Sequence, residues 1–325
     1  MAIWLPEALK RRIRPLPQWS PIALRQPQDV VRVHLSSADG EIDVTRAAVV
    51  AALRPLTLAV GMGDHGPGQA PFIANGLSEP RLRFVDIESG RSIGALYLQH
   101  VRDWDSCGAR IGFFTIRRAT QNCVRWPYRP WNRWLQNRLI RRNTDPHNFH
   151  MPPEAVQQQM IFYICPRPVV LVSVDDGQHS NLFPMDLIGP ISADHFTLAL
   201  RSTSQSIPTM KSARKVALTD VAARDYAIAY KLGAHHKNVK VAWDQLPFGI
   251  QRSRNFALPC PQSALRIREA EILDFDTIGS HTFFLTRIVS DEGAAEDLRF
   301  FHTSGLYQHF RARCGRPLPA AAGAS

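Results

Sequence analysis

The sequence predicts a protein of the α+β class that is mainly β, with a smaller α+β domain followed by a β-barrel. After Pro153 the chain repeats apolar runs rich in β-branched residues: MIFYI, RPVVLVSV, FTLALRS, KVALTDV and HTFFLTRIVS. Such runs are typical of strands. Long helical patterns do not alternate with them, so a parallel sheet is not indicated, and several antiparallel strands close most economically into a barrel. A length of 325 residues is enough for two domains.

The composition is that of a globular protein, with 45% hydrophobic and 21% charged residues. This balance excludes a largely disordered chain. No apolar run is long enough for a membrane span, and the N-terminus has no apolar signal core, so we expect a soluble cytoplasmic protein. The cysteines are scattered and odd in number, which argues against a disulfide framework and structural zinc. They are Cys107, Cys123, Cys165, Cys260 and Cys314.

The formal charge of +11 belongs almost entirely to the first half. Residues 1–150 hold 21 Lys and Arg against 12 Asp and Glu, whereas residues 151–325 hold 18 against 16. A basic half indicates either an anionic partner, such as nucleic acid, a lipid surface or a phosphorylated ligand, or a solvated basic face. No nucleic-acid-binding motif accompanies the charge, so both interpretations stay open.

The first half begins with a basic, Pro-rich arm over residues 1–28, expected to lie on a surface or to be mobile. The α+β domain spans 29–150. VVRVHLSS predicts a strand, and Asp43 is placed to cap a helix through TRAAVVAAL. LRFVDIESGRSIGALYLQHV predicts two strands around a turn at Glu88-Ser89-Gly90, and ARIGFFTIRR predicts a further strand.

A helix from Pro130 through WNRWLQNRLIRRN would carry Trp131, Trp134, Leu135 and Leu139 on one stripe. This stripe fits a core or domain-interface helix, a dimer contact or lid, or a contact with membrane or nucleic acid. The prolines that follow mark the boundary to a second domain, 151–313. Residues 314–325 have no core-forming pattern and are expected to be a disordered tail.

Four segments of the second half, taken in order, carry a resemblance to a known family. They are PRPVVLVS (166–173) with NLFPMD (181–186), RSTSQSI (201–207), GSHTFF (279–284), and the closing HTSGLY (302–307). In this order they resemble the flavin-reductase-like family with its FMN-binding split barrel. The resemblance covers about 157–311 and extends to no part of the first half. It implies FMN as cofactor, NAD(P)H as electron donor, and a homodimer of barrels with FMN at the interface.

The resemblance also implies site residues. NLFPMD is similar to the family's N-x-x-P-x-S flavin loop, and RSTSQSI stands where the family presents hydroxyls to the FMN phosphate. GSHTFF is similar to the G-D-H-x-x-F strand near the nicotinamide, which makes His281 the candidate catalytic residue. The implied flavin contacts are Asn181, Phe183, Pro184, Met185, Asp186, Arg201, Ser202, Thr203, Ser204 and Ser206. Met185-Asp186 and Ser280 depart from the family pattern, so use of NAD(P)H is less secure than flavin binding.

The residue chemistry is compatible with these roles. A guanidinium beside hydroxyls, as in Arg201 to Ser204, offers charge-assisted hydrogen bonds to a phosphate. Asn181 can contact the flavin edge or hold its own turn. His281 can point to the cleft or to the core. His235 and His236 face opposite ways if extended and have no third ligand spaced with them, so we expect no metal site.

The leading hypothesis is an FMN-binding oxidoreductase that takes hydride from NAD(P)H and delivers electrons to a small-molecule acceptor or a partner oxygenase. The alternative is a non-catalytic FMN-binding electron carrier or sensor that docks through its basic first half. A third hypothesis is a module that binds nucleic acid or a membrane through the arm and the Trp/Arg helix.

Overall fold

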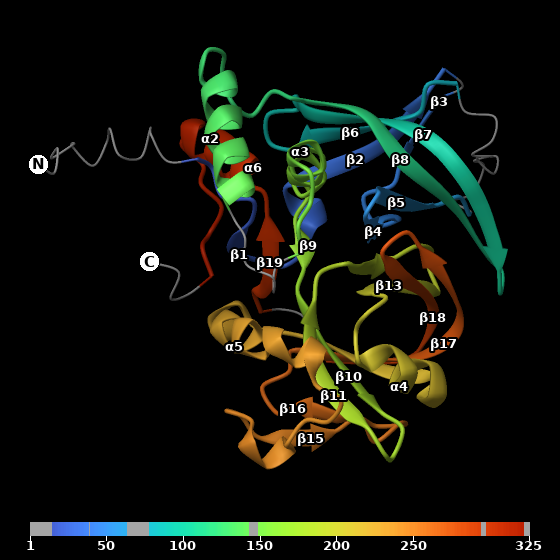
Figure 1. The fold of residues 1–325 in the computed structure, drawn as a ribbon. Helices are drawn as coiled ribbons and strands as arrows, with labels where there is room; N and C mark the ends of the chain where they lie inside the picture. The colour runs from blue at the N-terminus through green and yellow to red at the C-terminus, as the bar shows by residue number, and fades with distance from the viewer. Residues whose placement is uncertain (1–14, 39, 64–77, 143–148, 294–296, 322–325) are drawn as a thin grey trace, which may run out of the picture.

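The computed structural model describes residues 15–38, 40–63, 78–142, 149–293 and 297–321. Within these ranges the strands form two seven-stranded antiparallel sheets, together with a three-stranded and a two-stranded sheet. The N-terminal sheet faces the C-terminal sheet, which curls into a half-open barrel (Figure 1). The α+β class with a mainly β second half is therefore confirmed.

The N-terminal sheet is built from the first half of the chain. In spatial order its strands are β3 (Gly40–Asp43), β2 (Val31–Ser37), β6 (Arg81–Asp86), β7 (Ser92–Ser106), β8 (Ala109–Gln121), β5 (Leu56–Gly61) and β4 (Ala48–Leu53). The predicted strand 31–37 and the predicted hairpins are confirmed. The sheet's long β7–β8 hairpin reaches over the C-terminal barrel (Figure 1).

The predicted helix after Asp43 is wrong, because this segment forms β4. The first five residues of β4 are all buried. A strand covered on both faces is uniformly apolar and lacks the alternation that separates a strand from a helix. Asp43 accepts hydrogen bonds at Oδ1 from the backbone N–H and hydroxyl of Thr45 and so fixes a turn instead of a helix.

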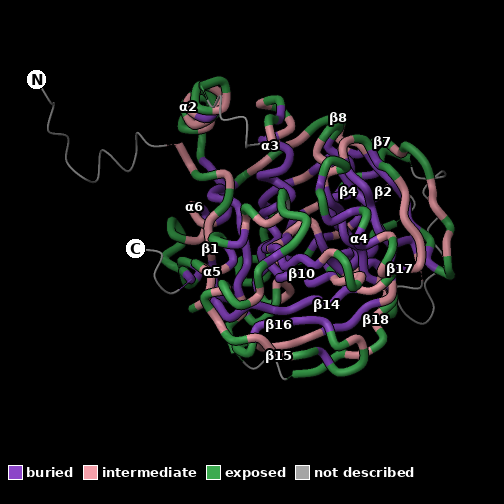
Figure 2. The backbone as a smooth tube through the Cα atoms, turned by 60° about the horizontal axis from the view of Figure 1, so that its bottom comes forward, coloured by how far each residue is buried: buried purple, intermediate pink, exposed green. Residues whose placement is uncertain are grey.

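The C-terminal sheet contains four of the five predicted strands of the second half: RPVVLVSV, FTLALRS, KVALTDV and HTFFLTRIVS. In spatial order it holds β11 (Ser180–Met185), β10 (Val170–Asp175), β14 (Lys215–Asp220), β17 (Arg266–Ile278), β18 (His281–Glu292), β13 (His195–Arg201) and β12 (Ile188–Pro190). β15 (Ile250–Arg252) and β16 (Pro259–Pro261) form the small hairpin beneath it. Figure 2 shows β10 and β14 buried inside the molecule.

The fifth prediction, MIFYI, is wrong, because residues 160–162 end a helix that begins at Pro153 and a turn follows. A short apolar run that is fully buried does not distinguish a strand from a helix.

The two seven-stranded sheets have the same topology. Taken in chain order, the strands β2, β3, β4, β5, β6, β7 and β8 occupy the same places as β10, β11, β12, β13, β14, β17 and β18. The hydrogen-bonded registers agree as well. Val60 pairs with Ala48 on one side and Gly112 on the other, and Leu198 pairs in the same way with Ile188 and Phe284.

Both ends of the described chain pack into the fold. β1 (Ser20–Leu24) and β9 (Arg167–Pro168) flank β19 (Arg299–Thr303) in the three-stranded sheet, and Ile22 is fully buried. Residues 20–24 are therefore not a free arm, and residues 1–14 lie outside the described ranges. The expected disordered tail is wrong for residues 314–321, because Leu318 and Ala321 are buried and Ala23 N donates to Pro319 O. The apolar side chains of this tail follow no regular period, but they are nevertheless buried against β1.

The helices are α2 (Tyr128–Arg142), α3 (Pro153–Phe162), α4 (Ser206–Ala213), α5 (Tyr226–Lys231) and α6 (Gly305–Arg313). The predicted helix from Pro130 is confirmed, but its tryptophan stripe is not core. Trp131 and Trp134 stack on each other and remain 45% and 49% exposed. The buried contact of α2 is polar, with Gln136 Nε2 donating to Leu16 O. The interpretation of this stripe as a core contact is therefore wrong.

One apolar cluster crosses the expected domain boundary at residue 150. Phe84 of the N-terminal sheet packs against Phe162 of α3, and the same cluster includes Phe301 and Tyr307 from the end of the chain. The Tyr307 hydroxyl donates to Asp86 Oδ1 at 2.7 Å. The N-terminal sheet therefore completes its core with residues from the second half.

Candidate functional site

A cavity of about 600 Å³ lies beside the C-terminal sheet and brings most of the expected site residues together. Its walls include the end of β11 and the turn after it, the end of β13, and the start of β18. Leu53 from β4 and Phe149 from the segment before α3 add apolar surface from the other half. The expected residues in its lining are Phe183, Pro184, Met185, Asp186, Arg201, Ser204 and His281.

Arg201 and Ser204 form the cationic end of this cavity. Arg201 is the last residue of β13, and its backbone carbonyl accepts from Ser204 N at 2.8 Å. Its guanidinium lies 4.8 Å from the centre of the Phe149 ring, and burial lowers its pKa without removing its charge. Helix α4 begins two residues after Ser204, so its positive end faces the same loop. Ser202 and Thr203 are exposed and do not line the cavity.

His281 is opposite Arg201 in the strand register and lines the cavity. Its side chain is almost fully buried, with Nδ1 2.9 Å from Ser280 Oγ and the ring edge-to-face with Phe149. Burial, with a smaller contribution from Arg201, lowers the pKa of His281 to about 4. The imidazole is therefore neutral at physiological pH and can donate one hydrogen bond while it accepts another.

Asp186 is the first of three polar side chains in the cavity lining that are joined by hydrogen bonds. Its Oδ2 lies 2.9 Å from His302 Nδ1, and His302 Nε2 lies 2.9 Å from the Tyr230 hydroxyl. The carboxylate favours the tautomer with hydrogen on Nδ1, so Nε2 accepts from Tyr230. Burial and then Asp186 raise the pKa of Tyr230 to about 12. The phenol therefore stays protonated, and its hydrogen bond connects Tyr230 to His302 and Asp186.

Asn181 and Ser206 do not line the cavity. Asn181 is 1% exposed, and its Nδ2 lies within 3 Å of Ser206 Oγ, His235 O and Asn238 O. Its Oδ1 accepts from Leu182 N. Both groups of the amide are thus engaged in holding β11 to the segment after α5. Of the two interpretations of Asn181, the geometry favours the structural one.

Sequence reasoning missed several residues of this wall. Phe149, Tyr230 and His302 come from three separate parts of the chain and meet only in the folded protein. His302 stands in the closing segment that carried the resemblance, and this was the available signal for it. Phe149 and Tyr230 are single aromatic residues in segments without a motif, and no spacing identifies them.

Comparison with protein families identifies the class of domain. The family described as "Flavin reductase like domain" matches residues 162–309. The C-terminal half of the chain is therefore a flavin-reductase-like domain, as the sequence resemblance predicted. The match begins after the N-terminal sheet, so it says nothing of residues 1–150.

Solved structures of flavin reductases and FMN-binding proteins are similar to about half of the chain. An NADH:FAD oxidoreductase from Streptomyces globisporus is 16% identical over 49% of this chain and 95% of its own, with a TM-score of 0.42. The flavin reductase component of a bacterial two-component tryptophan halogenase is 17% identical over 46% and 92%, with a TM-score of 0.41. An FMN-binding protein from Thermus thermophilus is 20% identical over 48% and 87%, with a TM-score of 0.39.

These identities and TM-scores are low, so the assignment of the domain depends on the family match. A comparison with curated proteins gave no match. In the described ranges no helix is both long and apolar enough to cross a membrane.

Proposed function

We propose that the protein is an FMN-binding oxidoreductase that accepts hydride from NAD(P)H and passes electrons to a small acceptor or a partner oxygenase. The observation that supports it is the convergence of the flavin-loop residues, Arg201 and His281 on one cavity. FMN would supply the hydride and electron chemistry when bound. The cavity volume of about 600 Å³ lies in the range of sites for ligands of this size.

The residues at each end of the cavity suit FMN. Arg201, Ser204 and the start of α4 would hold the phosphate through charge-assisted hydrogen bonds. Phe183, Met185 and Leu53 would cover the ring with apolar surface and exclude water. Neutral His281 would orient the nicotinamide carboxamide by a hydrogen bond.

The site forms within one chain in this proposal. The resemblance implied a homodimer because FMN was expected between two barrels. Here the second wall, which includes Leu53 and Phe149, comes from the same chain. A dimer of whole chains is therefore not needed to complete the cavity, and sedimentation of the flavin-loaded protein measures which assembly exists.

The absorbance spectrum of the purified protein, before and after addition of FMN, is the first test. We expect a bound flavin with bands shifted from those of free FMN, and reduction by NADH or NADPH under anaerobic conditions. A protein that shows no flavin uptake at micromolar FMN contradicts the proposal.

The second candidate function is an electron carrier or sensor without turnover of its own. It is favoured by Ser280, whose hydroxyl occupies the position where the family's motif has an aspartate and bonds to Arg54 N at 3.1 Å. Stopped-flow mixing with NADH and NADPH separates the two, because a carrier binds FMN but is not reduced by either nucleotide. A cytoplasmic location stays an expectation from the sequence.

A further inference from the structure

The two sheets face each other as equivalent halves of an internal pseudo-dimer. The backbone N–H of Gly61 donates to Ala47 O at 2.8 Å, and the N–H of Ala199 donates to Leu187 O at 2.9 Å. These matching bonds make Ala47 equivalent to Leu187, and hence Arg46 equivalent to Asp186. Buried side chains of both sheets form the apolar contact between the halves: Val49, Ala51, Ala59, Ile111 and Phe113 with Ile191, Ala199, Ile278, Phe283 and Leu285.

The contacts between the halves are reciprocal. The turn between β4 and β5 meets the turn between β17 and β18, where Ser280 N donates to Arg54 O at 2.9 Å. The equivalent turn between β12 and β13 meets the β7–β8 turn, with His195 Nε2 3.1 Å from Cys107 O. Reciprocal contacts of this kind are the signature of a twofold interface. Under a twofold relation, a site that forms between the two halves occurs a second time at the symmetry-related position.

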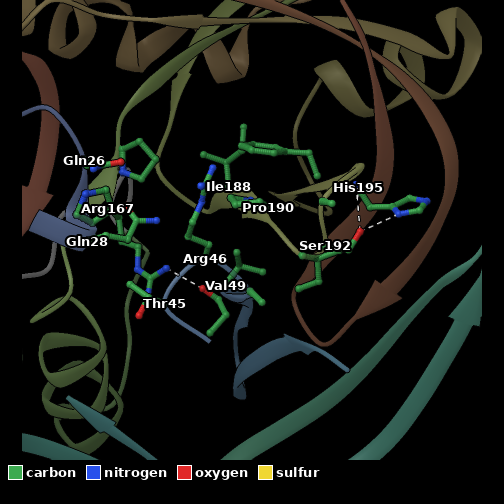
Figure 3. A pocket seen from close by; sticks show the side chains of 18 of the residues that line it. Gln26, Gln28, Thr45, Arg46, Val49, Arg167, Ile188, Pro190, Ser192 and His195 are labelled. Carbon is green, nitrogen blue, oxygen red and sulfur yellow. Dashed lines mark hydrogen bonds between the residues drawn. The ribbon is translucent and has the colours of Figure 1, made fainter. Parts of the chain in front are cut away.

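A second cavity, of about 790 Å³, lies at the position related to the first one. Equivalent residues line both cavities: Thr45 and Met185, Arg46 and Asp186, Ala47 and Leu187, Gly63 and Arg201. The wall from the opposite half is also repeated, because residues 191–193 and 195 stand where the first cavity has Leu53. Figure 3 shows Arg46, Ser192 and His195 around this second cavity.

The chemistry of the second cavity differs from that of the first. Its lining holds six arginines and two aspartates, whereas the lining of the first holds Arg201 and Asp186 as its Arg and Asp side chains. Arg32 pairs with Asp43, and Arg266 pairs with Asp291. Arg268 and Arg299 share the buried carboxylate of Asp220. The last two arginines, Arg46 and Arg167, have no carboxylate partner among the described residues.

Arg167 shows most clearly that positive charge is in excess. It is 6% exposed, its Nη1 donates to Ala48 O at 2.7 Å, and its Nε and Nη2 have no hydrogen-bond partner among the described residues. Stacking on Phe162, at 4.0 Å from the ring centre, compensates part of this burial. A buried guanidinium remains charged, so an anion nearby would stabilise it.

Arg46 adds an exposed guanidinium to the lining of the same cavity. Its side chain is exposed and makes no hydrogen bond or ion pair with the residues that the structure describes. The cavity also offers apolar surface from Ile188, Pro190 and Phe301. We propose that this cavity is a second ligand site, which binds a small organic anion with a phosphate or carboxylate group held by Arg46 and an apolar part against these side chains.

Calorimetric titration of the full-length protein with phenyl phosphate and with benzoate tests the site and separates the two anion classes, because each probe has one anionic group and one apolar ring. The protein is first saturated with FMN, so that the Arg201 end of the first cavity is filled. We expect saturable binding of one anion per chain for at least one of the probes. Arg46→Glu should weaken it at least tenfold, and Arg46→Gln should weaken it less, because only the first reverses the charge.

Arg91→Glu is the matched control, since Arg91 is an exposed arginine outside both cavities. It changes the net charge by the same amount and should leave binding within twofold. Equal losses in the Arg46 and Arg91 variants, or no saturable binding of either probe, overturn the proposal. Binding that is lost in Arg201→Gln but kept in Arg46→Glu assigns the anion to the first cavity and also overturns it. If the protein takes up no FMN, the proposed function is contradicted, but the second ligand site is not. In that case the anion titration of the FMN-free protein tests the second site.

Discussion

Val49 and Gly189 occupy equivalent positions in the two sheets and lie against each other where the sheets meet. A Cβ atom at Gly189 would lie 2.7 Å from Val49 Cγ1, closer than the two carbons can approach. In a twofold interface a residue meets its own equivalent at the axis. The contact therefore locates the pseudo-twofold axis next to β4 and β12.

Gly189→Ala should destabilise the protein by about 1–3 kcal/mol, because the added methyl overpacks the contact with Val49. Val49→Ala in the same chain should restore part of this loss, since it removes the atom that the new methyl meets. Denaturant unfolding of both single variants and the double variant measures the coupling. Additive effects would show that the two residues do not share this contact.

Arg201 and Ser204 should make the protein prefer FMN to riboflavin. Replacing both by Ala should reduce the affinity for FMN and leave that for riboflavin nearly unchanged, with charged hydrogen bonds contributing about 1.5–3 kcal/mol each. Fluorescence titration with the two flavins gives both constants, and Ser202→Ala is a control because Ser202 lies outside the cavity. Equal affinity of the wild type for FMN and riboflavin is the contradicting result.

His281 should contribute more to reduction by the nicotinamide than to flavin binding. In His281→Ala we expect flavin to be retained and reduced on the order of tenfold more slowly, which corresponds to about 1.4 kcal/mol for one lost hydrogen bond. Anaerobic single-turnover reduction by NADH and NADPH, at matched flavin occupancy, measures this. Unchanged rates would leave His281 with a structural role.

The neutral His281 should also make the fold sensitive to acid. Its pKa of about 4 in the folded state lies below the usual 6.5, so between these values the unfolded chain binds a proton that the folded protein does not. Stability should therefore fall as the pH drops from about 6.5 to about 4, by up to about 3 kcal/mol from this group. His281→Gln removes the titration, so its unfolding free energy should change less over this range. An identical pH profile for the variant rules out this cause.

A chain that begins at Met151 should not yield a soluble monomer with bound flavin. Removal of the N-terminal sheet would expose Phe283 and Leu285 on one side and Phe162 on the other. An exposed apolar surface of this kind promotes association. Light scattering and circular dichroism of the truncated chain report its state, and a folded monomer with full flavin occupancy would contradict the internal pseudo-dimer.

The sequence by itself determined four strands of the second half, β10, β13, β14 and β18, and the family whose domain matches that half. It also predicted the residues Phe183 to Asp186, Arg201, Ser204 and His281 that meet at one cavity. Strands with β-branched runs and motifs of consecutive residues are local features, so they can be recognised before the chain is folded.

Only the tertiary structure decided how the first half is used. The β4 strand lacks alternation because it is covered on both faces, and it was therefore predicted as a helix. The identical strand order of the two sheets was not predicted, because strand order depends on hydrogen bonds between segments that are distant in the sequence. For the same reason Phe149, Tyr230 and His302 join the site only in the folded protein. The equivalence of Arg46 and Asp186 likewise appears only when the two folded sheets are compared.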